Sequence, residues 1–278
     1  MKQLFDNISD TTSRITTKAY SNSFSLGILC LGKRLRQPIY NIYGFVRFAD
    51  EIVDTFHDYD KEALLREFRE DTVKAIERGI SINPVLNSFQ KVVHDYNIEW
   101  ELIDCFLNSM EMDLDQSAHN RMSYDEYILG SAEVVGLMCL RVFTEGDETL
   151  YQKLKPAAMR LGAALQKVNF LRDIKDDYEA LGRTYFPGVN MSNFSMQDKL
   201  HIENEIEQDF NVALEGIKQL PDSSRFGVYV AFVYYKQLFL KIRSLPSHSI
   251  MQQRIRIPNY AKLALLFTSY FKHSLHLV

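Results

Sequence analysis

Cysteine is scarce in this sequence. The 278 residues include three cysteines, Cys30, Cys105 and Cys139, which lie too far apart in the chain for a zinc motif. Each has apolar neighbours, as expected of a small residue in the core. This usage is typical of a protein from a reducing compartment.

Long apolar runs and an excess of basic charge are also absent. No uninterrupted apolar segment approaches the roughly 18 to 20 residues that span a bilayer, and MKQLFDNISDTTSR lacks the apolar region of a signal peptide. The net charge is -4 and the basic residues are scattered among acidic ones, which argues against nucleic acid as a partner. We expect a soluble, cytoplasmic protein whose membrane contact, if it makes one, is peripheral.

Sustained alternation of apolar and polar residues, which is typical of half-buried strands, is missing. Apolar residues instead recur at three- and four-residue spacing, as at Leu64, Phe68, Val73 and Ile76, which is the period of amphipathic helices. The seven prolines are predicted to lie where helices begin or join. Since no linker or repeat divides the chain, the sequence predicts one all-α domain over residues 1–278, with about ten helices.

One helix, expected over residues 36–57, carries charges in the otherwise apolar sequence FVRFADEIVDTF. Asp50 and Asp54 are four residues apart and Arg47 lies one turn earlier, so the three share a face. Like charges at this spacing destabilise an isolated helix by a few tenths of a kcal/mol, and burial adds to the cost. A divalent cation would compensate for the repulsion. The alternative is a solvated acidic face, continued by FHDYDK.

A second acidic face follows in VNFLRDIKDDYEALGRTYFP. Asn169, Asp173 and Asp177 recur at intervals of four. Gln166 extends this face backwards and Arg172 adjoins it. Mg²⁺ commonly binds through a few carboxylates together with substrate phosphates, and arginine offers planar donors to phosphate oxygens. Two such faces on separate helices predict a cleft for a divalent metal and a diphosphate. A transition metal is disfavoured, because no His or Cys lies at ligand spacing beside the acids.

The segments FVRFADEIVDT and ALQKVNFLRDIKDDYEALGRTYFP resemble the two aspartate-rich motifs of the squalene/phytoene synthase family, the head-to-head prenyltransferases. Further similar blocks are SNSFSLGILCLGKRLRQPIYNIYGFVR, MEMDL, SAEVVGLMCL and, near the end, RIRIPNYAKLAL. The resemblance covers about residues 20–265. It implies the isoprenoid-synthase fold, similar to class I terpene synthases, in which one all-α bundle surrounds a central cavity.

The resemblance also implies roles for individual residues. The aspartates implied as catalytic are Asp50, Asp54, Asp173 and Asp177, and these with Asn169 would coordinate Mg²⁺, for which Mn²⁺ could substitute. The residues that match substrate contacts are Ser21, Asn22, Ser23, Tyr43, Arg47, Gln166, Arg172 and Tyr235, with Arg183, Tyr185 and Arg254 as weaker matches. Alternatives to a substrate contact stay open. Tyr43 and Tyr235 could be core aromatics, and Ser21 could cap a helix. Tyr234 could occupy the family position assigned to Tyr235.

The chain departs from the family pattern just before VGLM. The family usually has Tyr-x-Val-Ala-Gly there, often after an aromatic residue, whereas this chain has YILGSAEVVGLM. The aromatic role is therefore not expected at Leu129 or Gly130, and Glu133 replaces the usual glycine. Because an unpaired buried carboxylate is costly, we expect Glu133 to face away from substrate and meet a cation. The alternative is that it reshapes the pocket wall.

By resemblance, the reaction joins two geranylgeranyl diphosphates to phytoene through a cyclopropylcarbinyl diphosphate. Apolar helix faces that include Phe24, Phe45, Leu137 and Leu165 would enclose the isoprenoid chains. NADPH is not expected, since only squalene formation needs a hydride. The alternatives are squalene or dehydrosqualene synthesis from farnesyl diphosphate, and a non-catalytic member that acts as a binding or assembly factor. Prenyl diphosphates are the expected partners, membrane contact would serve product release, and the oligomeric state stays open.

Overall fold

The computed structural model describes residues 1–115, 119–180, 184–189, 194–252 and 254–258, and parts of residues 261–269. Arg183, one of the weaker substrate matches, lies outside these ranges. Within them the chain folds into helices without a β-strand, which confirms the all-α prediction. The helices are α1 (Lys2–Tyr20), α2 (Asn22–Leu29), α3 (Lys33–Asp54), α4 (Lys61–Arg78), α5 (Pro84–Tyr96), α6 (Trp100–Asp115), α7 (Arg121–Ile128), the π-helical η1 (Leu129–Glu133), α8 (Val134–Thr144), α9 (Glu148–Ala180), α10 (Met196–Ile217), α11 (Asp222–Arg243) and α12 (Ser247–Ile250).

Several helix ends follow directly from local side-chain chemistry. The Asp60 carboxylate accepts a hydrogen bond from the Ala63 amide at 3.0 Å and so caps the start of α4. Gly79 ends that helix in the left-handed conformation, at φ 67°. Asn83 caps α5, and Pro84 occupies its first turn, where a missing amide hydrogen costs nothing.

The prediction that every proline marks a helix start or join is wrong at two positions. Pro38 lies inside α3 and Pro156 inside α9. A proline inside a helix removes one backbone hydrogen bond and crowds the preceding turn. Both helices pack along their length against neighbouring helices, so burial keeps them continuous across the proline.

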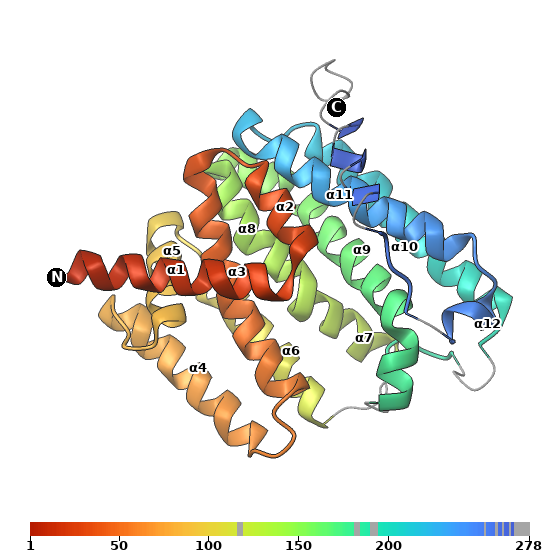
Figure 1. Cartoon of the computed structure of the whole chain (residues 1–278), viewed down its shortest axis with the longest axis horizontal. Helices are drawn as coiled ribbons and strands as arrows, with labels where there is room; N and C mark the ends of the chain where they lie inside the picture. Colours follow the sequence, from red (N-terminus) through yellow and green to blue (C-terminus); the bar gives the residue numbers. More distant parts are fainter. Residues whose placement is uncertain are drawn as a thin grey trace.

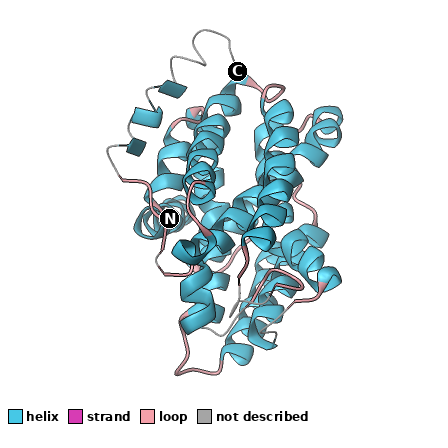
Figure 2. Ribbon diagram, turned by 90° about the vertical axis from the view of Figure 1, so that its right-hand side faces the viewer, coloured by secondary structure: helices cyan, strands magenta, loops and turns pink. Residues whose placement is uncertain are grey.

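The long helix α9 is central to the arrangement of the other helices. It packs against η1, α8, α10 and α11, while α3 packs against α1, α4, α5, α6 and α8. Figure 1 shows α9 between α8 and α10, and Figure 2 shows several long helices running side by side. The two helices predicted to carry the acidic faces thus lie in the interior of the bundle.

The opposite face of α3 is fixed by aromatic packing. Phe45 is fully buried, stacks on Phe89 of α5 at 3.9 Å between ring centroids, and also contacts Phe68 and Phe106. Burial of a large aromatic side chain stabilises the fold by about 1.5–3 kcal/mol. Because Phe45 is held there, Arg47, Asp50 and Asp54 face the other way.

Helices α7, η1 and α8 form one continuous stretch. By length and composition Arg121–Thr144 could cross a membrane, but 61% of its apolar window is buried inside the structure, as in a core helix. The π-helical turn brings the Ala132 carbonyl very close to Gly162 of α9, so that a Cβ on Gly162 would lie 2.5 Å from the Ala132 oxygen. The close approach of η1 to α9 therefore requires glycine at 162.

We predict that Gly162→Ala lowers the free energy of unfolding by about 1–3 kcal/mol, because backbone atoms must move to admit the methyl group. The matched control is Gly27→Ala in α2, where the added Cβ would meet the Gly227 oxygen at an ordinary 3.5 Å. That variant should be neutral or stabilising, since alanine favours helix. Urea denaturation of both variants measures the effect, and equal shifts would contradict the close-packing argument.

Candidate active site

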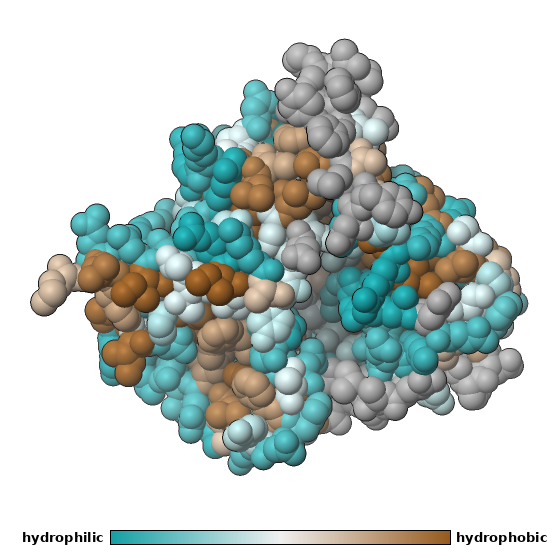
Figure 3. Space-filling view, viewed as in Figure 1, coloured by the Kyte–Doolittle hydropathy of each residue, from teal (hydrophilic) through white to brown (hydrophobic). Residues whose placement is uncertain are grey.

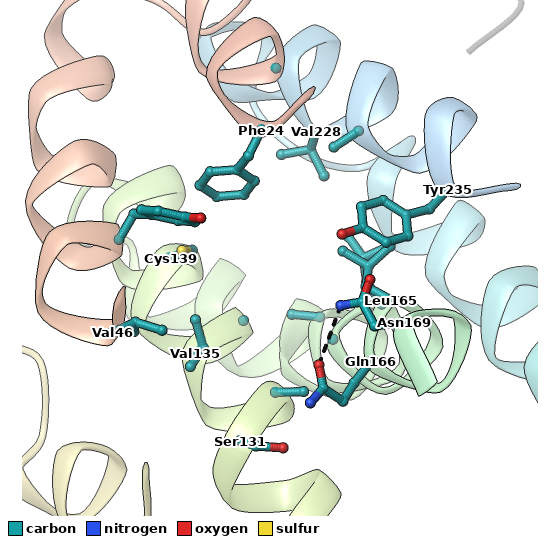
Figure 4. Close-up of a pocket in the computed structure, with 18 of the residues that line it drawn as sticks. Phe24, Val46, Ser131, Val135, Cys139, Leu165, Gln166, Asn169, Val228 and Tyr235 are labelled. Carbon is teal, nitrogen blue, oxygen red and sulfur yellow. Dashed lines mark hydrogen bonds between the residues drawn. The ribbon is translucent and has the colours of Figure 1, made fainter. Parts of the chain in front are cut away.

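A cavity of about 570 Å³ lies among α3, α8, α9 and α11, with further wall residues from α2, α6 and α10. Figure 4 shows Phe24, Val135, Cys139, Leu165 and Val228 around this space, together with Tyr235 and Asn169. Its wall joins apolar side chains to carboxylates and arginines. The predicted site residues that line it are Tyr43, Arg47, Asp50, Asp54, Gln166, Asn169, Arg172, Asp173, Asp177 and Tyr235.

On α3, the helical repeat places Tyr43, Arg47, Asp50 and Asp54 on the cavity side. Arg47 pairs with Glu51, and its Nη1 lies 3.9 Å from Asp50 Oδ2. The same guanidinium lies 4.2 Å from the centroid of the Tyr20 ring at the end of α1. Arg47 is thereby held at the cavity wall beside the first acidic pair.

The first acidic pair is electrostatically strained without a cation. Burial, followed by repulsion from Asp54, raises the pKa of Asp50 to about 7, although Arg47 opposes the shift. Burial and the Asp50 charge also raise the pKa of Tyr43 to about 12, so its hydroxyl stays protonated at neutral pH. Added positive charge at this position would relieve the repulsion.

On α9, Asp173 of the second acidic face forms ion pairs with two arginines. Arg172 Nε donates to Asp173 Oδ1 at 2.9 Å, and Arg254 Nε lies 2.7 Å from the same oxygen. Arg254 comes from the segment after α12 and also lines the cavity. Burial lowers the pKa of Arg172, but the bonds to Asp173 outweigh it and the net shift is upward. Two guanidinium groups therefore converge on one carboxylate at the cavity wall.

The structure resolves the register at Tyr235 and the alternative for Ser21. Tyr235 lines the cavity, whereas the Tyr234 ring lies near the ammonium group of Lys262, 5.4 Å away. Ser21 is the N-cap of α2 and accepts a hydrogen bond from the Phe24 amide at 3.2 Å, so it does cap a helix. Neither Ser21 nor Ser23 is among the described wall residues, and the Asn22 side chain lies outside the described part of the chain.

Sequence reasoning gave no role to two polar wall residues, Asp113 and Tyr127. The Tyr127 hydroxyl donates to Asp113 Oδ2 at 2.7 Å, and both residues line the cavity. Burial and the Asp113 charge raise the pKa of Tyr127. Tyr185, a weaker match, also lines the cavity and stacks on Phe170 at 3.9 Å. The block MEMDL contains Asp113, but only the fold shows that α6 turns it toward Asp50 and Asp54.

The apolar wall differs in part from the prediction. Phe24 and Leu165 line the cavity, whereas Phe45 and Leu137 do not. Phe45 belongs to the aromatic cluster behind α3, and Leu137 is buried on another side of α8. Residue type alone does not show which side of a buried helix faces the cavity, because both sides carry apolar side chains.

The departure before VGLM also has a structural explanation. Gly130 packs against α6 so closely that a Cβ would lie 2.6 Å from Ser109 Cβ, which leaves no room for a side chain there. Leu129 packs against the core and is not a described wall residue. Glu133 is buried outside the cavity lining, so its predicted orientation agrees with the structure. Burial raises its pKa, and the charge of Arg160, the largest favourable influence on it, acts to lower it.

The oxygen-rich wall fits a hard divalent cation shared with substrate better than a metal held by protein alone. Among the described residues, no three His, Cys, Asp or Glu side chains are grouped closely enough to hold a metal ion. Helix α3 instead offers Asp50 and Asp54, and α9 offers Asp173 and Asp177. The Asn169 Oδ1 atom is buried without a hydrogen-bond partner. Mg²⁺ accepts this incomplete set when phosphate oxygens supply the remaining ligands.

We predict that Asp50→Asn changes the pH dependence of stability in metal-free buffer. The folded-state pKa of about 7 exceeds the ordinary 3.8, so the folded state binds the proton more tightly. This contribution to stability is present at low pH and is lost as pH rises through about 7. The thermal midpoint of the variant should therefore rise relative to wild type between about pH 4 and pH 8.

The control is Asp58→Asn, which removes one carboxylate from the exposed turn after α3. Thermal midpoints measured with excess chelator across the same pH range make the comparison. A difference between Asp50→Asn and wild type that stays constant with pH would show that Asp50 is not strained in the folded state.

Comparisons with known proteins show the family and the fold of this chain. The chain belongs to the squalene/phytoene synthase family, whose sequence model matches residues 17–261. Its fold is the all-α isoprenoid-synthase fold: a crystal structure of a dehydrosqualene synthase in complex with a ligand superposes with a TM-score of 0.85 at 22% identity, covering 97% of this chain and 98% of that one.

Two curated relatives are similar over different lengths. A phytoene synthase from Arthrospira platensis is 25% identical, over 91% of this chain and 89% of its own. A 4,4'-diapophytoene synthase from Staphylococcus haemolyticus is 28% identical, over 69% of this chain and 65% of its own. Members of the family are head-to-head prenyltransferases, which supports an enzymatic role for the chain.

Proposed function

We propose that this protein condenses two geranylgeranyl diphosphates head to head to form phytoene. The observation that carries the proposal is one cavity whose wall joins two carboxylate-bearing helices, with arginines beside them, to an extended apolar surface. Such a site suits a substrate with a concentrated negative charge at one end and a long hydrocarbon at the other. The similarity to the Arthrospira platensis phytoene synthase along nearly its whole length supports the choice of product.

In the proposed reaction, one prenyl diphosphate loses its diphosphate and is attacked by a double bond of the second. This gives a cyclopropylcarbinyl diphosphate, which ionises and rearranges, and each half of the reaction releases one diphosphate and one proton. The aspartates of α3 and α9, with Asn169, would hold Mg²⁺, which when bound neutralises charge on the leaving diphosphate. Arg47, Arg172 and Arg254 line the same cavity and would donate hydrogen bonds to diphosphate oxygens.

The chain's own apolar residues protect the carbocations. Leu165, Val135 and Phe143 line the cavity and offer no nucleophile. Tyr43 stacks on Phe24 with 5.0 Å between ring centroids, and its raised pKa keeps the hydroxyl neutral. A water-excluding wall of this kind lowers the chance that water captures the cation before rearrangement.

A second candidate is the same chemistry with farnesyl diphosphate, giving dehydrosqualene. The similarity to the 4,4'-diapophytoene synthase favours it. The two candidates share the charged residues and differ in the length of chain that the apolar wall must enclose.

The test is an assay of purified protein with farnesyl or geranylgeranyl diphosphate and Mg²⁺, with and without NADPH, followed by identification of the hydrocarbon. We expect phytoene from geranylgeranyl diphosphate, no requirement for NADPH, and loss of product in excess chelator. Dehydrosqualene as the main product would favour the second candidate, and full turnover with chelator present would exclude the proposed role of the acidic faces.

We further predict that Asp173→Asn lowers turnover by at least about a hundredfold, because it removes a proposed ligand and the partner of two arginines. The matched control is Asp176→Asn, an exposed carboxylate on the same helix that is not among the wall residues. It should keep wild-type turnover. Near-equal rates for the two variants at saturating Mg²⁺ would contradict the assignment of α9.

A further inference from the structure

Helix α1 has its polar face buried and its apolar face in solvent. Its buried residues are Ser9, Ser13, Thr16 and Thr17. Ser13 Oγ is hydrogen-bonded to Ser88 Oγ at 2.7 Å, and Asn87 Nδ2 donates to Ser9 Oγ at 3.1 Å. A surface helix normally turns its apolar stripe toward the core. Here hydrogen bonds, with little apolar burial, attach the helix to the bundle.

The solvent-facing side of α1 carries large apolar residues, which are usually buried in a protein core. Met1, Leu4, Ile8 and Ile15 are spaced so that they share one face, and we refer to them as the α1 stripe. Leu4, Ile8 and Ile15 are 63%, 50% and 61% exposed. Figure 3 shows apolar side chains in a row along this helix. Exposed apolar residues aligned in this way mark an interaction surface.

A neighbouring loop adds to the same region. Ile80 and Ile82 lie between α4 and α5, and Ile82 is 98% exposed. Asn87 connects this loop to α1, since its Oδ1 accepts from the Ser81 amide at 3.3 Å and its Nδ2 donates to Asp6 Oδ1 at 3.1 Å. The loop is therefore held beside the first half of α1.

The charges on α1 indicate what covers the stripe. The exposed charged residues of the helix are Lys2, Arg14 and Lys18, all cationic, and Lys2 pairs with Asp6 at 2.9 Å. Its two carboxylates are half-buried and engaged: Asp6 accepts from Asn87, and Asp10 Oδ1 accepts from Asn41 Nδ2 at 2.8 Å. Arg14 and Lys18 form no ion pair with the residues that the structure describes. An apolar stripe bordered by Arg14 and Lys18 matches the interface of an anionic bilayer.

We propose that the α1 stripe, with Ile80 and Ile82, docks this protein onto an anionic lipid bilayer, with α1 lying in the plane of the interface. A second copy of the chain suits the surface less well, because it would present the same unpaired cations. The proposal concerns a surface outside the cavity and does not depend on the proposed reaction. It is tested without substrate.

The test measures co-sedimentation with vesicles of phosphatidylcholine alone or mixed equally with phosphatidylglycerol. We expect wild type to bind the mixed vesicles, and Leu4→Ser/Ile8→Ser/Ile15→Ser to weaken this partitioning by at least about tenfold. Arg14→Gln/Lys18→Gln should remove the preference for phosphatidylglycerol, with an unchanged thermal midpoint.

The matched control replaces three residues of similar exposure elsewhere, Leu200→Ser/Val212→Ser/Leu240→Ser, on α10 and α11. It should bind vesicles as wild type does. The proposal is overturned if wild type binds neither kind of vesicle, or if the α1 triple variant binds as wild type does. It is also overturned if light scattering shows a wild-type oligomer that the α1 triple variant breaks while vesicle binding is absent, because a second copy then covers the stripe.

Discussion

Repulsion between carboxylates that face one cavity is the constraint on which the rest of the site depends. Asp50 and Asp54 lie within one turn of α3, and burial with mutual repulsion raises the Asp50 pKa to about 7. Across the cavity, Asp173 is held by two arginines. On α3, Arg47 compensates only part of the carboxylate repulsion. On α9, two close ion pairs neutralise the charge of Asp173. In the proposed function, a diphosphate with its cations would satisfy both carboxylate groups at once.

Close helix packing holds the walls of this cavity in place. Small residues let α8, α9 and α10 approach one another: a Cβ on Gly136 would lie 3.0 Å from the Ala158 oxygen, and one on Gly216 would lie 2.3 Å from Ala157 Cβ. The aromatic cluster around Phe45 fixes α3 from behind. Rigid walls on both sides allow an apolar space to persist between them.

Helix α1 connects the surface of the molecule to its site. Its polar inner face leaves the apolar side chains outward, and at its end the Tyr20 ring lies against the Arg47 guanidinium, which lines the cavity. A bilayer at the α1 stripe would thus lie on a helix that also contacts the arginine of the first acidic motif. The hydrocarbon product and the amphiphilic substrates of the proposed reaction would both partition into lipid, which is consistent with that placement.

The amino-acid sequence is enough to predict the helical class and the two acidic faces, because both depend on local spacing: a four-residue interval places Asp50 with Asp54, and Asp173 with Asp177, on one face of any helix. The motifs that carry these aspartates also identify the family. Which side of a buried helix meets the cavity depends on tertiary packing. The sequence pattern therefore wrongly predicts Phe45 in the wall, does not distinguish Tyr235 from Tyr234, and gives no signal for the pairing of Asp113 with Tyr127. Contacts between α6, α7 and α9 depend on chain segments far apart in sequence, and the helical period of any one segment carries no information about its neighbours.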